Sequence, residues 1–110
     1  MIEIAKLLVK NGITTIIPLI SPYRETREQA RREIPNFVEV YTKASLETCI
    51  RRDPKGLYKN AKEGKIQNMT GLQSPCEEPK NPEIMLDTEK TTPQQCLEKI
   101  LSKLDQLKIL

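Results

Sequence analysis

The sequence predicts an α/β fold in which helices cover both faces of a parallel sheet. Apolar runs of strand length alternate along the chain with segments whose residues recur at the helical period. Strands that alternate with helices are joined by crossover connections, which place the strands parallel in one sheet. The chain has 110 residues, enough for one small domain. We expect about three strands, at 13–20, 37–42 and 83–88.

The first expected strand, 13–20, is β-branched and apolar on both faces, as in a strand buried on both sides of a parallel sheet. Pro18 lacks the backbone N–H that a paired strand donates. We therefore expect Pro18 near the end of the strand or at an unpaired edge. A helix over 2–11 precedes this strand and ends at Gly12, a residue suited to helix termination.

The helices predicted after this strand have recognisable ends. Residues 24–34 are rich in Arg and Glu and stop at Pro35. Ser45 can cap a helix over 46–52, which Pro54 ends. The segments that follow are less regular: residues 55–66 are basic and helical or irregular, and 67–82 read as a loop.

The last helix has the clearest signal. Thr92 and Gln95 have the spacing of a capping box, and Pro93 occupies the first helical position. The apolar residues that follow share one helical face: Leu97, Ile100, Leu101, Leu104 and Leu107. We predict a helix over 93–108.

Composition excludes several classes of protein. The sequence contains no His, which rules out a Ser-His-Asp triad and a His-ligated metal site within it. It has no phosphate-binding G-x-x-x-x-G-K-[ST] loop and no dinucleotide G-x-G-x-x-G pattern. Its three cysteines, Cys49, Cys76 and Cys96, are widely spaced and form no C-x-x-C. This pattern predicts neither a zinc site nor a disulfide framework, and it favours a reducing compartment.

Charge and hydropathy predict no nucleic-acid or membrane partner. The net charge is +3 and only four residues are aromatic, which is weak support for binding nucleic acid. The longest apolar run, 16–20, is interrupted by Pro18 and is far too short to span a membrane. The amino terminus does not have the layout of a signal peptide. We expect a cytoplasmic protein.

Four segments carry a family resemblance. They are LISPYRETRE at 19–28, FVEVY at 37–41, CIRRDPKGLYKNAKEGKIQNMTGL at 49–72, and PKNPEIMLDT at 79–88. In this order and spacing they resemble the adenylyl-sulfate kinase (APS kinase) family. The resemblance implies a P-loop nucleotide-kinase-like fold. It also implies transfer of the γ-phosphate of ATP to the 3′-hydroxyl of adenylyl sulfate, a step of sulfate assimilation.

The resemblance also implies that part of the family domain lies outside this sequence. Family members begin with a strand, a G-x-x-G-x-G-K-[ST] loop and an acidic D-G-D segment, and this sequence contains neither motif. We therefore expect residues 1–110 to be the carboxyl-terminal part of a kinase domain, with an incomplete sheet and a lid over about 52–72. ATP would bind with Mg²⁺, whose ligands we expect in the missing part. The chain alone would be inactive, and the family implies a homodimer.

On the substrate side, Ile20 and Ser21 match family positions that contact adenylyl sulfate. The family match also makes Ser21 a candidate phosphoserine. Because the sequence offers no His as a base, a hydrogen-bonding role is favoured for Ser21 over a covalent one. The alternative is a strand-end serine that caps the next helix, with Pro22 at its first position.

In the expected lid, Lys55 matches the family lysine that meets the substrate, where its charge would stabilise the transferred phosphoryl group. Lys59 and Lys62 recur at helical spacing and are better explained as a solvated face. Arg52 would approach ATP from the lid.

Asn68 and Met69 stand where the family has a Gly-Phe pair, whose Phe stacks on the adenine of adenylyl sulfate. Met69 can pack on a purine but lacks a flat π surface. Thr91 lies near the family's ATP-adenine site, although Thr91 and Thr92 also suit helix capping.

Three functions remain open at this point. The first is the substrate-binding and lid half of an adenylyl-sulfate kinase, favoured by Ile20, Ser21 and Lys55. The second is a kinase-like regulatory or nucleotide-binding module without a P-loop, which Met69 favours slightly. The third is an α/β interaction domain that binds no ligand.

Overall fold

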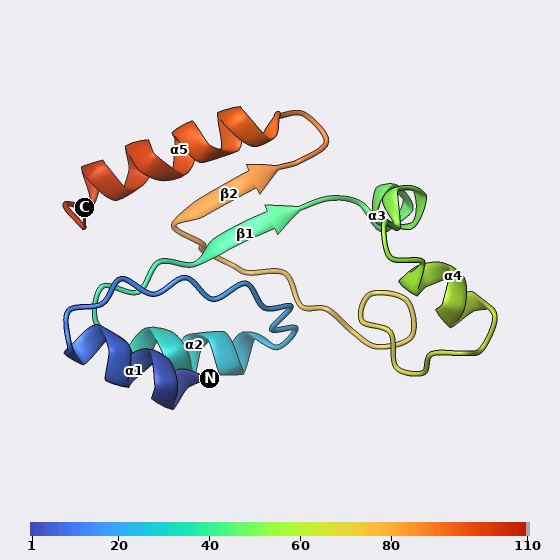
Figure 1. Cartoon of the computed structure of the whole chain (residues 1–110), viewed down its shortest axis with the longest axis horizontal. Helices are drawn as coiled ribbons and strands as arrows, with labels where there is room; N and C mark the ends of the chain where they lie inside the picture. Colours follow the sequence, from blue (N-terminus) through green and yellow to red (C-terminus); the bar gives the residue numbers. More distant parts are fainter. Residues whose placement is uncertain (110) are drawn as a thin grey trace.

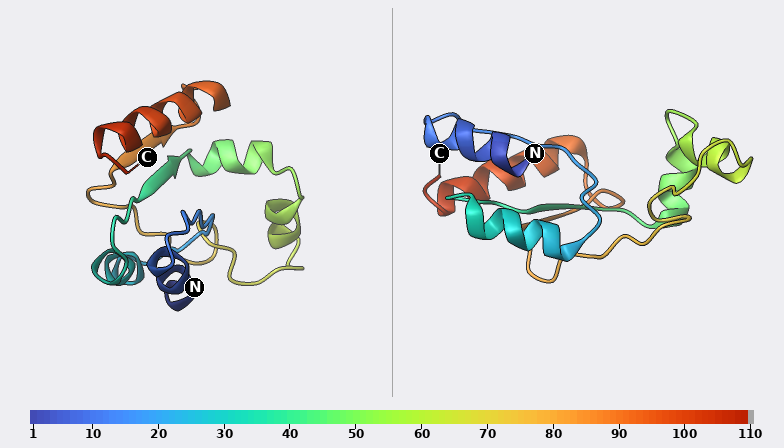
Figure 2. Two further views of the ribbon diagram at one scale, coloured as in Figure 1. Left: turned by 60° about the vertical axis from the view of Figure 1, so that its left-hand side comes forward. Right: turned by 90° about the horizontal axis from the view of Figure 1, so that it is seen from below.

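The computed structural model describes residues 1–109. Its elements, in chain order, are α1 (Ile2–Lys10), α2 (Arg24–Glu33), β1 (Val40–Lys43), α3 (Leu46–Arg52), α4 (Leu57–Lys62), β2 (Ile84–Asp87) and α5 (Pro93–Gln106). The sheet lies between α5 on one side and the α1–α2 pair on the other (Figure 1). Residues 46–76 form a separate α3–α4 lobe beyond the carboxyl ends of the strands, as the turned views also show (Figure 2).

The sheet consists of two parallel strands. Val40 pairs with Ile84, and the register continues to Lys43 beside Asp87. Ile84 and Leu86 are only 2% and 6% exposed, so alternate side chains along β2 point into the core. The parallel α/β arrangement predicted from the sequence is confirmed. β1 begins three residues later and ends one residue later than expected, and β2 is one residue shorter at each end.

The prediction of a strand at 13–20 is wrong for the described chain. The segment is irregular, and the sheet of residues 1–109 has two strands rather than three. A strand exists only through ladder bonds to a neighbour, and no strand lies beside this segment within the described residues. Most of its apolar side chains consequently face solvent, with Ile16 at 88% exposure and Ile17 half-buried.

The predicted starts of α3 and α5 are confirmed, whereas α1, α2 and α5 end one or two residues earlier than expected. The Ser45 hydroxyl accepts a hydrogen bond from the Thr48 N–H at 3.2 Å. At α5, the Gln95 N–H donates to the Thr92 hydroxyl at 3.2 Å, and the Thr92 N–H donates to the Gln95 side chain at 2.9 Å. Caps of this kind contribute about 1 kcal/mol each. Among residues 1–109, none of the helices has the length and apolar character needed to cross a membrane.

The hydrophobic core is small and the surface is large. The buried apolar residues are Ala5, Ala61, Ile84 and Leu86. The accessible surface is 8376 Å², whereas a globular chain of 12.6 kDa exposes about 6,200 Å². The radius of gyration is 15.7 Å, against about 13 Å for a typical domain of this length. Much apolar surface therefore lies uncovered within the described chain.

The two edges of the sheet differ. On the outer edge of β2, the Lys99 ammonium of α5 donates to the Met85 carbonyl at 2.7 Å, which occupies a group that another strand would use. The outer edge of β1, where the backbone of Val40 and Thr42 points away from β2, has no strand beside it in residues 1–109. The outer edge of β2 is thus partly occupied by a side chain, whereas the outer edge of β1 is not.

Candidate functional site

The Ser21 turn joins segment 13–20 to α2. Ser21 has φ +41°, a left-handed conformation that non-glycine residues rarely adopt. Its carbonyl accepts a hydrogen bond from Arg27, and the next carbonyl, of Pro22, accepts one from the Glu77 N–H at 2.8 Å. The neighbouring Ile20 is 71% exposed. Ser21 does not cap α2, whose N-cap residue is Tyr23, so the alternative capping role is wrong.

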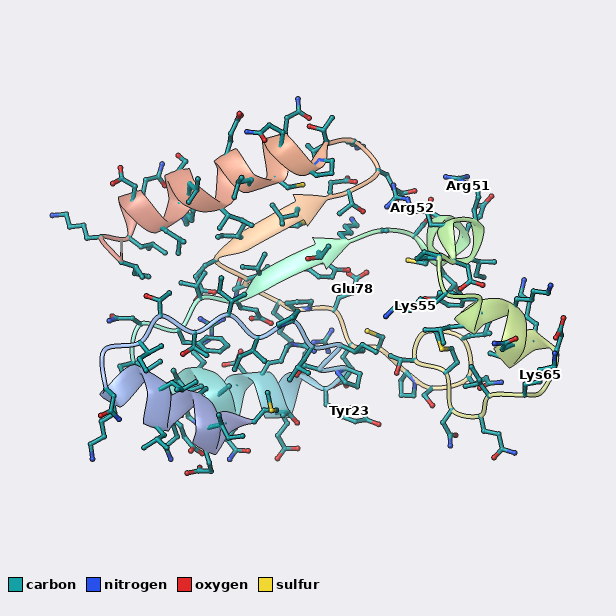
Figure 3. All side chains as sticks on the ribbon, in the orientation of Figure 1. Tyr23, Arg51, Arg52, Lys55, Lys65 and Glu78 are labelled. Atoms are coloured by element: carbon teal, nitrogen blue, oxygen red, sulfur yellow. The ribbon has the colours of Figure 1, made fainter. Side chains whose placement is uncertain are left out.

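Lys55 lies in a turn built by Asp53. The Asp53 carboxylate accepts the N–H groups of Tyr58 and Lys59 at 3.2 and 3.1 Å, which caps α4. Gly56 at the start of that helix has φ +66°, where glycine meets no steric cost. This turn leaves Lys55 exposed, and its side chain extends from the α3–α4 lobe toward the side of the molecule that carries Glu78 and Tyr23 (Figure 3).

Gln73 shapes the loop that carries Asn68 and Met69. The Met69 carbonyl accepts the N–H groups of residues 72–74 at 2.7–3.1 Å. The Gln73 side chain accepts the Met69 N–H at 2.8 Å and donates to the Ile66 carbonyl at 3.3 Å. Asn68 adopts φ +57° within this tight loop. Sequence reasoning missed Gln73, because its amide reaches the backbone of Met69, Ile66 and Ala61 only in the folded loop.

The two residues predicted on the ATP side, Arg52 and Thr91, both lie at the turn after β2, where Arg52 contacts Thr88 and Thr91 contacts Asp87. The Arg52 guanidinium donates to the Thr88 hydroxyl at 3.1 Å and to its carbonyl at 2.9 Å. Three residues on, the Thr91 N–H and hydroxyl both donate to the Asp87 carbonyl, at 3.0 and 2.6 Å. Thr92, rather than Thr91, is the N-cap of α5.

Glu89 in the same turn fastens the start of α3. Its carboxylate accepts hydrogen bonds from the Ser45 N–H at 3.0 Å, the Ser45 hydroxyl at 3.1 Å and the buried Thr48 hydroxyl. The hydrogen bond from Thr48, followed by that from the Ser45 N–H, lowers the pKa of Glu89. The α3–α4 lobe is therefore attached to the turn after β2 at both ends of α3. Sequence reasoning missed Glu89, which the chain brings to Thr48 from 41 residues away.

Ser21, Lys55 and Met69 lie on three separate segments, and within residues 1–109 no hydrogen bond or ion pair joins them directly. The three segments lie toward the carboxyl ends of β1 and β2 (Figure 1). Ligands of open parallel sheets bind at this end of the strands. That Ser21, Lys55 and Met69 bind the substrate stays a prediction. The described part of the chain gathers no three Asp, Glu, Cys or His side chains able to hold a metal ion, so no Mg²⁺ ligand is assigned to it.

Comparison with known proteins places the chain in one family. The family model of adenylylsulphate kinase matches residues 1–87. The chain is 48% identical over 106 residues to a probable adenylyl-sulfate kinase of Pyrococcus abyssi, covering 96% of this chain and 61% of that protein. It is 49% identical over 106 residues to the adenylyl-sulfate kinase of Staphylococcus epidermidis, covering 94% of this chain and 53% of the relative.

A solved structure agrees with these matches. The Mycobacterium tuberculosis APS kinase, in complex with AMPPNP and APS, superposes with a TM-score of 0.82 at 38% identity, covering 94% of this chain and 62% of that one. The chain thus spans between about half and two thirds of the proteins it matches. By these matches the chain belongs to the adenylylsulphate kinase family.

Proposed function

We propose that this chain is the substrate-binding and lid half of an adenylyl-sulfate kinase. The reaction is ATP plus adenylyl sulfate to ADP plus 3′-phosphoadenylyl sulfate. The observation that carries the proposal is the match of 94% of the chain to a kinase solved with AMPPNP and APS. It is supported by the position of the predicted site segments at the carboxyl ends of the strands.

Each predicted residue has a role in this proposal. Ile20 and Ser21 bind adenylyl sulfate from the turn after segment 13–20, and Asn68 and Met69 hold its adenine from the lid loop. Ser21 acts by hydrogen bonding, and its modification to phosphoserine is a secondary proposal. Lys55 offsets the charge that develops on the transferred phosphoryl group.

Arg52 and Thr91 form the ATP side of the proposed site. Both lie at the turn after β2, where hydrogen bonds from Arg52 to Thr88 fix the guanidinium. In a nucleotide kinase Mg²⁺ neutralises the phosphate charge and a P-loop holds the phosphates. The sequence contains no P-loop motif, so we propose that these 110 residues do not catalyse the reaction unless a P-loop is supplied.

Reconstitution tests the proposal. The purified chain is mixed with the part of the Pyrococcus abyssi relative that it does not match, and formation of 3′-phosphoadenylyl sulfate is measured. We expect no product from the chain alone and turnover from the mixture. Lys55→Met should lower this turnover at least tenfold, whereas Lys59→Met, the same change at an exposed position on α4, should leave it within twofold. Equal rates for the two variants would contradict the role of Lys55.

The alternative proposal is a regulatory or nucleotide-binding module, favoured by Met69 at the position of the stacking Phe. Calorimetry on the same samples separates the two functions. Binding of adenylyl sulfate or ATP without turnover in the mixture favours the module. We also propose the homodimer that the family implies, with light scattering as its test.

A further inference from the structure

Arg27 on α2 holds two backbone segments that lie far apart in the sequence. Its Nη1 donates to the Ser21 carbonyl at 2.5 Å, and its Nη2 donates to the Glu77 carbonyl at 2.7 Å. The Arg27 side chain is only 12% exposed. One planar guanidinium therefore fixes both the Ser21 turn and the irregular segment around Glu77 that leads to β2, a geometry that a single ammonium cannot reproduce.

Glu39 sets the orientation of this guanidinium. Its carboxylate is 9% exposed, with Oε1 at 2.9 Å from the Nε of Arg27 and Oε2 at 2.9 Å from Nη2 of Arg31. The Oε1 contact is an ion pair without hydrogen-bond geometry, and in residues 1–109 no other donor reaches this oxygen. A buried carboxylate needs a cation beside it, so Glu39 keeps Arg27 in place.

The ion pair is anchored on both strands. Glu39 and Glu83 are the residues immediately before β1 and β2. Arg31 pairs with Glu83 and lies 5.3 Å from the centre of the Phe37 ring, and Glu83 also accepts the Glu39 N–H at 3.1 Å. Burial acts to raise the pKa of Glu83, but the hydrogen bonds from Arg31 and the Glu39 N–H outweigh it and lower that pKa. The carboxylate that orients Arg27 is thus tied to the residues that precede both strands of the sheet.

Ser21 needs such support, because its left-handed backbone at φ +41° persists only where the surroundings hold it. We propose that Arg27 is a positioning residue that holds the Ser21 turn in the conformation that binds adenylyl sulfate, with Glu39 fixing the Arg27 guanidinium. The inference rests on the proposed function, because it takes adenylyl sulfate as the ligand of that turn.

The test is Arg27→Lys, which keeps the cation beside Glu39 but cannot donate to both carbonyls. The Arg27 side chain lines an open groove of about 630 Å³, and the lysine keeps a cation beside Glu39, so the variant should fold. The matched control is Arg32→Lys, the same change at an exposed position of α2. Calorimetry measures binding of adenylyl sulfate and of ATP to the chain and to the reconstituted mixture. NMR measures the HN–Hα coupling of Ser21, and thermal unfolding measures stability.

We expect Arg27→Lys to weaken adenylyl-sulfate binding about tenfold and to change the Ser21 coupling, with ATP binding unchanged and Arg32→Lys like the wild type. If the wild type binds adenylyl sulfate and Arg27→Lys binds equally well, the inference fails and the proposed function stands. An equal loss of ATP and adenylyl-sulfate binding, with a large fall in melting temperature, would reduce Arg27 to a structural role. If the wild type binds no adenylyl sulfate in either sample, both the proposed function and this inference are wrong.

Discussion

Arg52 binds Thr88 through both the hydroxyl and the carbonyl of the threonine, at 3.1 and 2.9 Å. The Thr88 hydroxyl in turn donates to the Lys43 carbonyl at 2.9 Å, so the guanidinium rests on the ends of both strands. The end of α3 and the turn after β2 are therefore one connected unit at the proposed ATP side of the site.

Replacing Arg52 by Met should weaken ATP binding in the reconstituted kinase by about fivefold, while adenylyl-sulfate binding stays unchanged. The exposed guanidinium contributes about 1 kcal/mol, because water screens its charge. Titration calorimetry with each nucleotide measures the change. Arg51→Met, at the neighbouring exposed position, is the control, and a similar loss of ATP binding there would contradict a specific role for Arg52.

Acid should release the start of α3 from Glu89. The pKa of this carboxyl is lowered in the folded chain from an ordinary value of 4.5, chiefly by the hydrogen bond from Thr48. Its hydrogen bonds therefore stabilise the fold fully above about pH 4.5 and lose that effect as pH falls through the lowered pKa. NMR titration of the Ser45 amide should report this transition. Glu89→Gln should abolish the transition, and an unchanged profile in that variant would assign it to another group.

Two isoleucines should respond very differently to the same truncation. Ile84→Ala removes a side chain that is 2% exposed, and we expect a loss of about 2–5 kcal/mol in unfolding free energy. Ile16→Ala changes a residue that is 88% exposed, and the expected effect lies within about 0.5 kcal/mol. Urea unfolding of the dilute chain compares them. A large loss for Ile16→Ala would show that segment 13–20 packs in a core in solution.

Met69→Phe should strengthen adenylyl-sulfate binding about two- to tenfold, because a flat ring stacks on a purine better than a thioether does. The loop is held through the Met69 backbone and the Gln73 side chain, so the exchange should leave its conformation intact. Calorimetry measures the affinity, with Met69→Leu as the apolar control of similar size. If Phe and Leu bind alike, the side chain at position 69 does not stack on the adenine.

Local chemistry in the sequence predicted the helices well. The cap at Ser45 and the capping box of Thr92 and Gln95 act within one helical turn, so the residues that define them stand together in the chain. The prediction of a strand at 13–20 was wrong because strand formation depends on residues outside the segment. Apolar, β-branched residues give a segment the capacity to form a strand, but the ladder bonds come from a neighbour that the pattern does not contain.

The side-chain network around the proposed site could not be predicted in the same way. Arg27 contacts Glu77 across 50 residues and Glu89 contacts Thr48 across 41, and charged residues at such distances look like ordinary surface in a single sequence. The motif resemblance indicated Ser21, Lys55 and Met69 as site residues, but it did not predict which side chains contact one another. Their binding roles stay predictions, whereas family membership is established by the matches over most of the chain.

The two edges of the sheet differ in how readily a further strand could pair with them. Lys99 occupies the Met85 carbonyl on the outer side of β2, whereas Val40 and Thr42 present free backbone groups on the far side of β1 within the described residues. A polypeptide that extends this sheet beside β1 would therefore meet no competing side-chain hydrogen bond. A strand that pairs there would take its register from Val40 and Thr42 of β1.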